Sequence, residues 1–418
     1  MGLAIIPTTL ARIRSSELLS REKAAIVLGS NLFGLAIGVT CIIMTFTQGL
    51  GLIGLAGSML AGQIGLLGGL FLIPRLLRFR LLGKIGLGFI AVIVGSALMM
   101  SSLSIVFPQI TAEEDRVIGH HLAMDTEVTI QVLTDDKEQA EEAIRAAFLE
   151  IDRVEKLMSA TDPDSQIYGL NNSGTQWVEL SPEVIYILKR AKEYGILTGG
   201  HFDVTVKPLV DFWMDEVKRS GTIPTSDELS EFLDLVDYSN LIIDEENNRA
   251  RFNEHGMAVT LGGIAKGYAV DRACEVLMSR GIEDALVDIG GDIRAIGTES
   301  WRIGIQDPRG AEGVSLGIIQ LQNKAIATSG DYERYYLIGA ERVHHIINPK
   351  TGEPAKDSIS TTIIAEDTLS ADALSTGVFV MGPERGRLLL NSIGVAGLII
   401  DSEGWITTSD YWDYDMSQ

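Results

Sequence analysis

The sequence predicts an α+β protein with mixed or antiparallel sheets and flanking helices, preceded by an all-α region of three transmembrane helices. Two observations divide the chain in this way. Residues before about 108 are almost continuously apolar, whereas from about Glu127 the apolar residues recur with the periods of strands and helices. A third observation sets the class: strand-like and helix-like segments alternate irregularly, with several expected hairpins, which favours α+β over a doubly wound sheet.

The N-terminal region contains three uncharged stretches, each near the roughly 20 residues that cross a bilayer as a helix. They are residues 24–46, 50–73 and 85–107. Arginine and lysine precede the first stretch and fill the loop between the second and third, and the positive-inside rule places both basic segments in the cytoplasm. A buried pair of helices is the alternative, but three such stretches in succession favour the membrane.

This topology divides the chain into two parts. We expect residues 1–108 to form a multi-pass region of the inner (cytoplasmic) cell membrane. Because three crossings leave the chain on the opposite side from its start, residues 109–418 are expected to form an extracytoplasmic domain. Of the two cysteines, Cys41 lies in a predicted span and Cys274 on a predicted helix, so a disulfide between them is not expected.

The charge of the second part excludes one class of partner. The chain has a formal charge of −22, from 34 basic and 56 acidic side chains. The first 108 residues carry eight basic and two acidic side chains, which leaves 26 basic and 54 acidic side chains and a charge of −28 for the remainder. So acidic a domain repels nucleic-acid phosphates. A phosphate-rich ligand would have to be bound locally, by metal, lysine and backbone amides.

The elements of this second part follow from local patterns. Alternation predicts a strand at its start, and apolar residues at helical spacing predict the first helix. Pro182 after Ser181 begins another helix, Asn247 and Asn248 turn a hairpin, and Gly281 ends a third long helix. The expected strands are residues 127–133, 241–244, 250–253, 285–289, 301–306, 317–321, 335–338, 360–365 and 396–400. The expected helices are residues 140–157, 182–197, 227–235, 264–280, 370–380 and 384–391.

Asp372 and Thr376 are four residues apart on one of these helices, so both side chains project from one face. A carboxylate and a neutral hydroxyl are hard oxygen donors that suit Mg²⁺. Taken alone, the same pair is more typical of an aspartate at a helix N-terminus and a surface threonine.

Two glycine-containing turns offer backbone to a ligand. Gly262 and Gly263 lead into a helix that carries Lys266 in its first turn, so free amides and an ammonium can face one anion. A tight turn and a solvated lysine are the alternative. Residues 288–292 (DIGGD) end a strand in flexible backbone, which is either a second place for close ligand approach or a hairpin turn.

Two adjacent histidines, His344 and His345, offer an imidazole that could take a proton from a hydroxyl near neutral pH. Neighbouring residues of a strand point to opposite faces, so we expect only one of them to serve. A packed structural histidine is the alternative for either.

Four strings occur in an order that resembles the ApbE-type FAD:protein FMN transferases. They are residues 260–271 (TLGGIAKGYAVD), 328–334 (TSGDYER), 344–354 (HHIINPKTGEP) and 370–376 (SADALST). Residues 120–130, 162–170, 199–213 and 281–297 agree as well. The resemblance covers about residues 116–408 and implies an ApbE-like fold for this part, with the membrane region as an addition.

The resemblance also implies a reaction and a set of site residues. Enzymes of this family take FAD and Mg²⁺, transfer FMN through its phosphate to a threonine or serine of an acceptor redox protein, and release AMP. By similarity, Asp372, Thr376 and the carbonyl of Gly263 would bind the metal, and Lys266 would contact FAD. His345 would activate the acceptor hydroxyl. The flavin nucleotide site would be lined by Met124, Phe202, Asp203 and Ile346.

Three positions depart from the family pattern: Asp125 replaces a glycine, Thr161 a tyrosine that stacks on the cofactor, and Thr260 an aspartate. They predict weaker FAD binding and leave the metal ligands intact. Two alternatives therefore stay open, an Mg²⁺-dependent FAD pyrophosphatase and a non-catalytic, membrane-tethered FAD-binding protein. The chain contains no acceptor motif of the family's Asp-x-x-(Ser/Thr)-Gly-Ala-(Ser/Thr) type, so we expect its acceptors to be other proteins.

Overall fold

The computed structural model describes residues 108–113, 115–311 and 313–416. The three predicted transmembrane stretches, residues 24–46, 50–73 and 85–107, lie outside these residues. Within the described ranges, no helix is long and apolar enough to span a bilayer.

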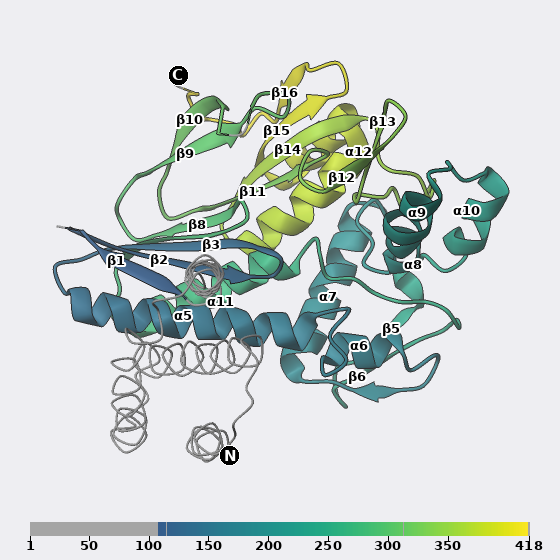
Figure 1. The fold of residues 1–418 in the computed structure, drawn as a ribbon, viewed down its shortest axis with the longest axis horizontal. Coiled ribbons are helices and arrows are strands. Elements are labelled where there is room, and N and C mark those ends of the chain that lie inside the picture. Colours follow the sequence, from purple (N-terminus) through teal and green to yellow (C-terminus); the bar gives the residue numbers. More distant parts are fainter. Residues whose placement is uncertain (1–107, 114, 312, 417–418) are drawn as a thin grey trace, which may run out of the picture. The chain divides into compact units, whose positions relative to one another are not determined.

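A nine-stranded sheet runs through the described residues, and its neighbouring strands are antiparallel (Figure 1). In spatial order its strands are β1 (Gln109–Ala112), β2 (Arg116–Ala123), β3 (Thr126–Leu133), β7 (Asp284–Ile289), β8 (Asp292–Ile296), β11 (Ala325–Gly330), β14 (Ser358–Ala365), β15 (Ala396–Asp401) and β16 (Ile406–Thr408). The predicted α+β class with antiparallel sheets is confirmed.

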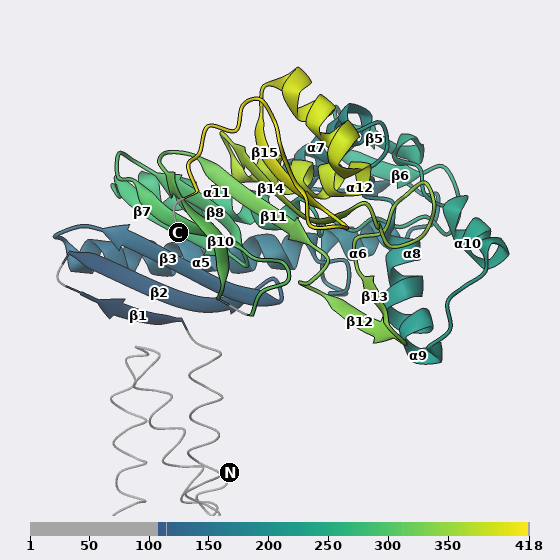
Figure 2. The ribbon, with the colours of Figure 1, turned by 90° about the horizontal axis from the view of Figure 1, so that it is seen from above.

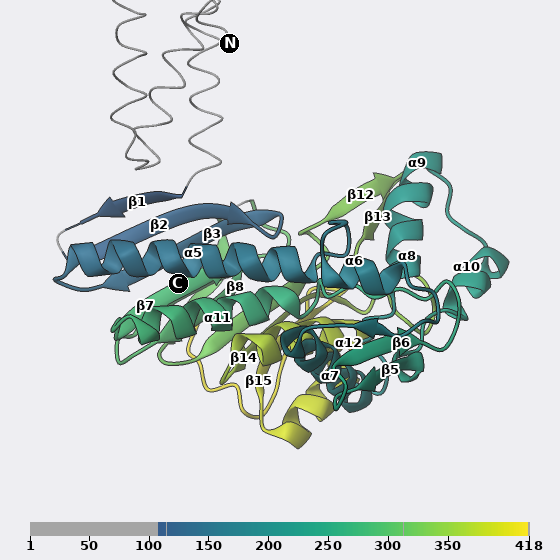
Figure 3. The ribbon, with the colours of Figure 1, turned by 90° about the horizontal axis from the view of Figure 1, so that it is seen from below.

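Both faces of the sheet are covered. Three long helices, α5 (Lys137–Met158), α11 (Ala265–Ser279) and α12 (Thr368–Ile393), pack on one face, and Figure 3 shows α5 and α11 side by side across it. The hairpin of β9 (Trp301–Gln306) and β10 (Ser315–Leu321) packs on the other. Strand β7 contributes to both layers: Ala285, Val287 and Ile289 join the helix-side core, and Leu286, which alternates with Asp284 and Asp288 on the other face, joins the core under the hairpin.

A smaller layer of short elements extends from the end of the main sheet. It contains α6 (Gln166–Asn171), α7 (Pro182–Leu197), α8 (Lys207–Asp211), the π-helical turn η3 (Phe212–Val217), α9 (Lys218–Ser220), α10 (Ser226–Leu233), the 3₁₀ turn η4 (Tyr238–Asn240), and a small sheet of β4 (Val178–Glu179), β6 (Arg249–Phe252) and β5 (Leu241–Asp244). The hairpin of β12 (Tyr335–Ile338) and β13 (Glu341–His344) lies beside α8 and α9 (Figure 2). The hydroxyl of Tyr336 donates to the carbonyl of Trp213 over 2.6 Å and fixes this contact.

The local signals that predicted elements act as expected. Ser181 caps α7 with Pro182 at its first position, and α11 ends just before Gly281. Gly290 and Gly291, both with positive φ, turn the β7–β8 hairpin, so the hairpin interpretation of this segment is confirmed. The two helices expected at 370–380 and 384–391 form one element, α12, broken at Gly382, where φ is 77° and Pro383 follows.

Several elements had no clear signal in the sequence. Strands β8 and β11 contain polar residues, such as the buried Asp292 and the half-buried Ser329, that interrupt apolar alternation. The segment from α8 to α9 consists of short helical turns, which are too short for a helical period to emerge. These strands and turns carry parts of the site.

Candidate active site

The predicted metal ligands meet where helices α11 and α12 cross. At this point Gly267 of α11 allows direct backbone contact: a Cβ added to it would lie 2.3 Å from the carbonyl oxygen of Thr368 and 2.8 Å from Cβ of Asp372. The amide of Gly267 donates to Oδ2 of Asp372 over 3.0 Å. The crossing therefore holds the Asp372 side chain against the first turns of α11 and leaves Oδ1 for another partner.

Three oxygen donors can serve a cation here. Thr376 lies one helical turn beyond Asp372, and a Cβ added to Gly263 would lie 3.0 Å from Oγ1 of Thr376, so the backbone of Gly263 closes against that hydroxyl. The described residues contain no cluster of three or more His, Cys, Asp or Glu side chains suited to a metal. One carboxylate, one hydroxyl and backbone carbonyls nevertheless fit Mg²⁺, which keeps water and ligand phosphates in its other positions.

The electrostatics of Asp372 favour a cation. The side chain is 3% exposed, and burial, together with the nearby Asp292 carboxylate, raises its pKa to about 8. A carboxylate held in this way is costly to ionise, because charge in a low-dielectric site is poorly solvated. A bound divalent cation would relieve that cost.

Lys266 supplies a positive charge beside this carboxylate. Its ammonium pairs with the buried carboxylate of Asp292, which begins β8. Burial alone would lower the pKa of Lys266, but Asp292 and Asp372 outweigh burial and raise it above its usual value. The solvated-lysine alternative is therefore wrong, and Lys266 is held in place by a partner on the sheet.

Phe202 and Asp203 shape the wall next to Gly263. The ring of Phe202 approaches the position of a Gly263 Cβ to 3.2 Å. The carboxylate of Asp203 is engaged internally: it accepts the amide of Thr205 at 2.8 Å, the hydroxyl of Thr205 at 2.6 Å and the amide of Tyr238 at 2.9 Å. Asp203 therefore fixes the loop that presents Phe202.

The two histidines have different environments. Nε2 of His344 shares a 2.8 Å bond with the carbonyl of Ala355, and its Nδ1 accepts the amide of Ile346, so both nitrogens are used inside the fold. His345 follows β13 and is half-buried, with Nδ1 3.2 Å from the carbonyl of Arg334. A carbonyl only accepts, so Nδ1 carries the proton and Nε2 keeps a free lone pair. Burial lowers the pKa of His345 to about 4.

Ile346 and Met124 come from separate places. Ile346 is 7% exposed in a small cluster with Ala355, Phe379 and Val380. Met124 lies in the two-residue turn between β2 and β3, and Thr126, the first residue after this turn, packs against Gly290 of the β7–β8 turn.

The three positions that depart from the family pattern are polar and lie at or near the surface. Asp125 shares the β2–β3 turn with Met124, and its side chain is 85% exposed and 3.8 Å from Nη1 of Arg334. Thr161 is exposed and hydrogen-bonds to Ser159. The hydroxyl of Thr260 accepts the amide of Gly262 at 3.3 Å, which tightens the glycine turn.

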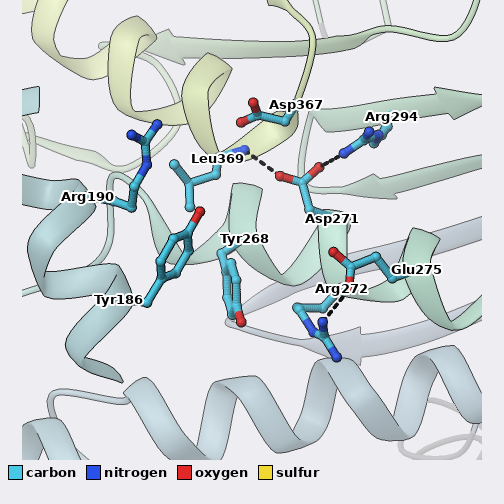
Figure 4. Close-up of a pocket in the computed structure, with 9 residues that line it drawn as sticks. All are labelled: Tyr186, Arg190, Tyr268, Asp271, Arg272, Glu275, Arg294, Asp367 and Leu369. Carbon is cyan, nitrogen blue, oxygen red and sulfur yellow. Dashed lines mark hydrogen bonds and ion pairs between the residues drawn. The ribbon is translucent and has the colours of Figure 1, made fainter. Parts of the chain in front are cut away.

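Two pockets in the described residues lie beside this site, and neither is lined by a predicted site residue. The larger, of about 340 Å³, is lined by Tyr268, Asp271, Arg272 and Glu275 of α11 (Figure 4). Helical spacing places these residues on a different face of α11 from Lys266. There Asp271 accepts the amides of Thr368 and Leu369, at 3.0 and 2.9 Å, and pairs with Arg294. This polar cluster fixes the start of α12 against α11, and it therefore sets the position of Asp372 along the crossing.

The structure brings together Gly263, Lys266, Asp372, Thr376 and Phe202. Local spacing did not reveal the partners of these residues: Asp292 for Lys266, Ser329 for Thr376, and Asp271 for α12. All three lie within the segments singled out from the sequence, which is the signal that could have identified them.

Comparison with known proteins gives a consistent set of matches. The family model of the ApbE family matches residues 124–399. A Vibrio cholerae protein named FAD:protein FMN transferase is 35% identical over 269 residues, which are 61% of this chain and 80% of that protein. A Klebsiella pneumoniae protein of the same name is 27% identical over 326 residues, 76% of this chain and 93% of the relative.

Solved structures agree in fold. The crystal structure of the ApbE protein from Thermotoga maritima matches with a TM-score of 0.66 and 36% identity, covering 72% of this chain and 97% of that chain. The flavin transferase ApbE from Vibrio cholerae matches with a TM-score of 0.62 and 29% identity, covering 73% and 99%. In each case the match spans nearly the whole solved chain.

Proposed function

This chain belongs to the ApbE family, and we propose that it is an Mg²⁺-dependent FAD:protein FMN transferase. It would transfer FMN from FAD to a threonine or serine hydroxyl of an acceptor redox protein and release AMP. The observation that carries the proposal is the helix crossing, where the carboxylate of Asp372, the hydroxyl of Thr376 and the ammonium of Lys266 converge. The names of the relatives supply the reaction.

The reaction is a phosphoryl-type transfer that balances without a further reactant. The acceptor oxygen attacks the phosphorus of the FMN half of FAD. The bond from that phosphorus to the bridging oxygen breaks, and AMP leaves with the electron pair. The proton of the hydroxyl goes to Nε2 of His345, the nitrogen that the Arg334 carbonyl leaves free.

The residues of the crossing stabilise the charge that develops on the diphosphate. Asp372, Thr376 and the carbonyl of Gly263 would hold Mg²⁺, which supplies Lewis-acid stabilisation of the phosphate oxygens. Lys266 adds a fixed positive charge, and its pairing with Asp292 orients it before the ligand arrives.

The flavin end has a separate set of proposed contacts. By the resemblance, Met124, Phe202 and Ile346 would line the flavin nucleotide site, with Phe202 and Ile346 buried in its wall. Asp203 acts through the loop it ties, because its carboxylate oxygens are already engaged.

The proposed setting is the outer side of the inner membrane. Residues 1–108 would anchor the chain through three spans, and residues 109–418 would work on neighbouring redox proteins outside the cytoplasm. Protease added to sealed vesicles of known orientation tests this topology. Cleavage of the C-terminal domain from the cytoplasmic face would contradict it.

Product analysis separates the transferase from its two alternatives. The full-length chain in detergent is incubated with FAD, Mg²⁺ and a peptide that carries the family's acceptor motif, and the products are weighed. FMN linked to the peptide, together with AMP, supports transfer. Free FMN with AMP would indicate a pyrophosphatase, and unchanged FAD with bound flavin would indicate a carrier, the outcome that Asp125, Thr161 and Thr260 favour.

A further inference from the structure

Three hydroxyl groups form a continuous chain behind the crossing. Oγ1 of Thr376 lies 3.2 Å from Oγ of Ser329 on β11. Oγ of Ser329 lies 2.8 Å from Oγ of Ser375, and Ser375 donates to the backbone carbonyl of Asp372 over 2.9 Å. Ser375 is 1% exposed, so within the described residues these contacts replace contacts with bulk water.

The hydrogen bonds of this hydroxyl chain can run in only one direction. A carbonyl only accepts, so the one proton of Ser375 is committed to Asp372. The 2.8 Å contact then needs the proton of Ser329, and the 3.2 Å contact needs the proton of Thr376. Any other assignment would place two lone pairs against each other in a site that is buried at Ser375 and half-buried at Ser329 and Thr376, and an unmade hydrogen bond away from water is costly.

This direction determines what Thr376 presents to the site. Its proton points toward Ser329, so the lone pairs of Oγ1 face away from β11, on the side where Gly263 closes against this oxygen. A hydroxyl that offers only lone pairs is a cation ligand, whereas one that offers its proton repels a cation.

We infer that Ser329 and Ser375 are positioning residues that orient the Thr376 hydroxyl as a ligand for the metal. The inference rests on the proposed function, because it assigns its cation to the same site. It goes further in giving the hydroxyls of Ser329 and Ser375 a role: they fix the direction of the Thr376 O–H bond, so that its lone pairs face the metal. Hydrogen bonds that orient a metal ligand in this way typically affect metal affinity by about 10–100-fold.

The neighbouring strand supplies a matched control. Thr361 of β14 is the cross-strand partner of Ser329 and is fully buried. Its hydroxyl makes no hydrogen bond with any described residue and so is not part of the hydroxyl chain. Thr361→Val removes a hydroxyl as buried as that of Ser375 without changing the side-chain volume much.

The experiment titrates Mg²⁺ alone into the full-length protein in detergent and follows the metal-induced rise in melting temperature, without FAD. Ser329→Ala and Ser375→Ala should each shift the Mg²⁺ midpoint upward by about 10–100-fold. Thr361→Val should keep the wild-type midpoint. Ser329→Thr, which keeps a hydroxyl at this position, should have a midpoint within a few fold of the wild type. FAD affinity measured without metal should be unchanged in all four variants.

The outcomes separate this inference from the proposed function. Wild-type midpoints in both serine-to-alanine variants would overturn the inference, as would an equal shift in Thr361→Val, which would indicate a general packing effect. Asp372→Asn is included for the site itself. If it leaves the Mg²⁺ response intact, the metal site of the proposed function is wrong, whatever the serines do.

Discussion

The helix crossing and the hairpin side of the site differ in how their geometry is fixed. The crossing comprises Gly263, Lys266, Gly267, Asp372 and Thr376, and it is held by buried backbone contact. Asp372 is 3% exposed and bonded to a backbone amide. The hairpin side comprises the β2–β3 turn and the base of the β12–β13 hairpin.

On the hairpin side the contacts are long and solvated. Asp125 and Arg334 are 3.8 Å apart, and their side chains are 85% and 53% exposed. An exposed pair of this kind contributes about 0–1 kcal/mol. The comparison indicates that a substitution at the crossing moves the reacting groups, whereas one at the exposed β2–β3 turn mainly adjusts affinity. The departures at Asp125, Thr161 and Thr260 fit this division, because none of them lies at the crossing.

The largest expected effect is at Asp372. Asp372→Asn keeps an acceptor for the Gly267 amide and removes the charge, so FMN transfer should fall below detection. The apo protein should become more stable at pH 7. The folded pKa of about 8 lies above the unfolded value, so at pH 7 the carboxyl takes up a proton as the chain folds, a cost that the asparagine does not have. Melting curves without metal check this, and a less stable variant would contradict it.

His345 tests the hairpin side. His345→Ala should lower the transfer rate by about 10²–10⁴-fold, the usual contribution of a general base, with little change in FAD affinity. Because the pKa of His345 is lowered to about 4, the acid limb of kcat/KM should have its midpoint near pH 4. Equal losses in rate and FAD affinity would contradict the assignment as base.

The same shift affects stability with a definite sign. The folded pKa of His345 lies below its unfolded value of about 6.5, so the unfolded chain binds the proton first as the pH falls. Stability from the neutral imidazole is present above pH 6.5 and is lost between about pH 6.5 and 4. The difference in melting temperature between the wild type and His345→Gln should shrink over that range.

The sequence predicted local geometry well and long-range partners poorly. The spacing of Asp372 and Thr376, the cap at Ser181 and the turn at Gly290 depend on neighbours a few residues away, and all are found in the fold. The partner of Lys266 is 26 residues along the chain and on a different element.

Asp203 illustrates the same limit. Its role depends on Tyr238, 35 residues away, which occupies an oxygen that the resemblance alone would leave for the ligand. The direction of the hydroxyl chain likewise required β11, a strand with no clear apolar pattern. Local spacing carries information on turns, caps and helix faces, and the pairing of buried polar groups is set by topology.

Gly267→Ala measures how rigid the crossing is. The new Cβ would lie 2.3 Å from the Thr368 carbonyl, so the helices must separate, at a cost of about 1–3 kcal/mol in stability. A displacement of Asp372 by about 1 Å can lower the rate by about 10²-fold. Gly262→Ala is the matched control, because its Cβ would meet only Oγ1 of Thr260 at 3.6 Å. Similar losses in both variants would show that the crossing has no special rigidity.

The smallest expected effect is at Asp125, where charge and backbone strain can be separated. Its φ of 61° is left-handed, at a cost of about 1 kcal/mol for a residue with a Cβ. Asp125→Gly should relieve this strain. Because the exposed contact with Arg334 is lost and glycine adds entropy to the unfolded chain, the net gain in stability should be only about 0.5 kcal/mol. The substitution should also tighten FAD binding severalfold by removing a negative charge near the phosphates.

Two further variants assign these effects. Asp125→Asn removes the charge and keeps a side chain that tolerates the left-handed region, so FAD affinity should rise without a gain in stability. Asn323→Gly, at a surface turn with φ of 44°, should give the gain in stability without any change in FAD affinity. Chemical denaturation and FAD titration on all three variants provide the check. If Asp125→Gly tightens FAD and Asp125→Asn does not, the shape of the β2–β3 turn, and not its charge, controls affinity on the hairpin side.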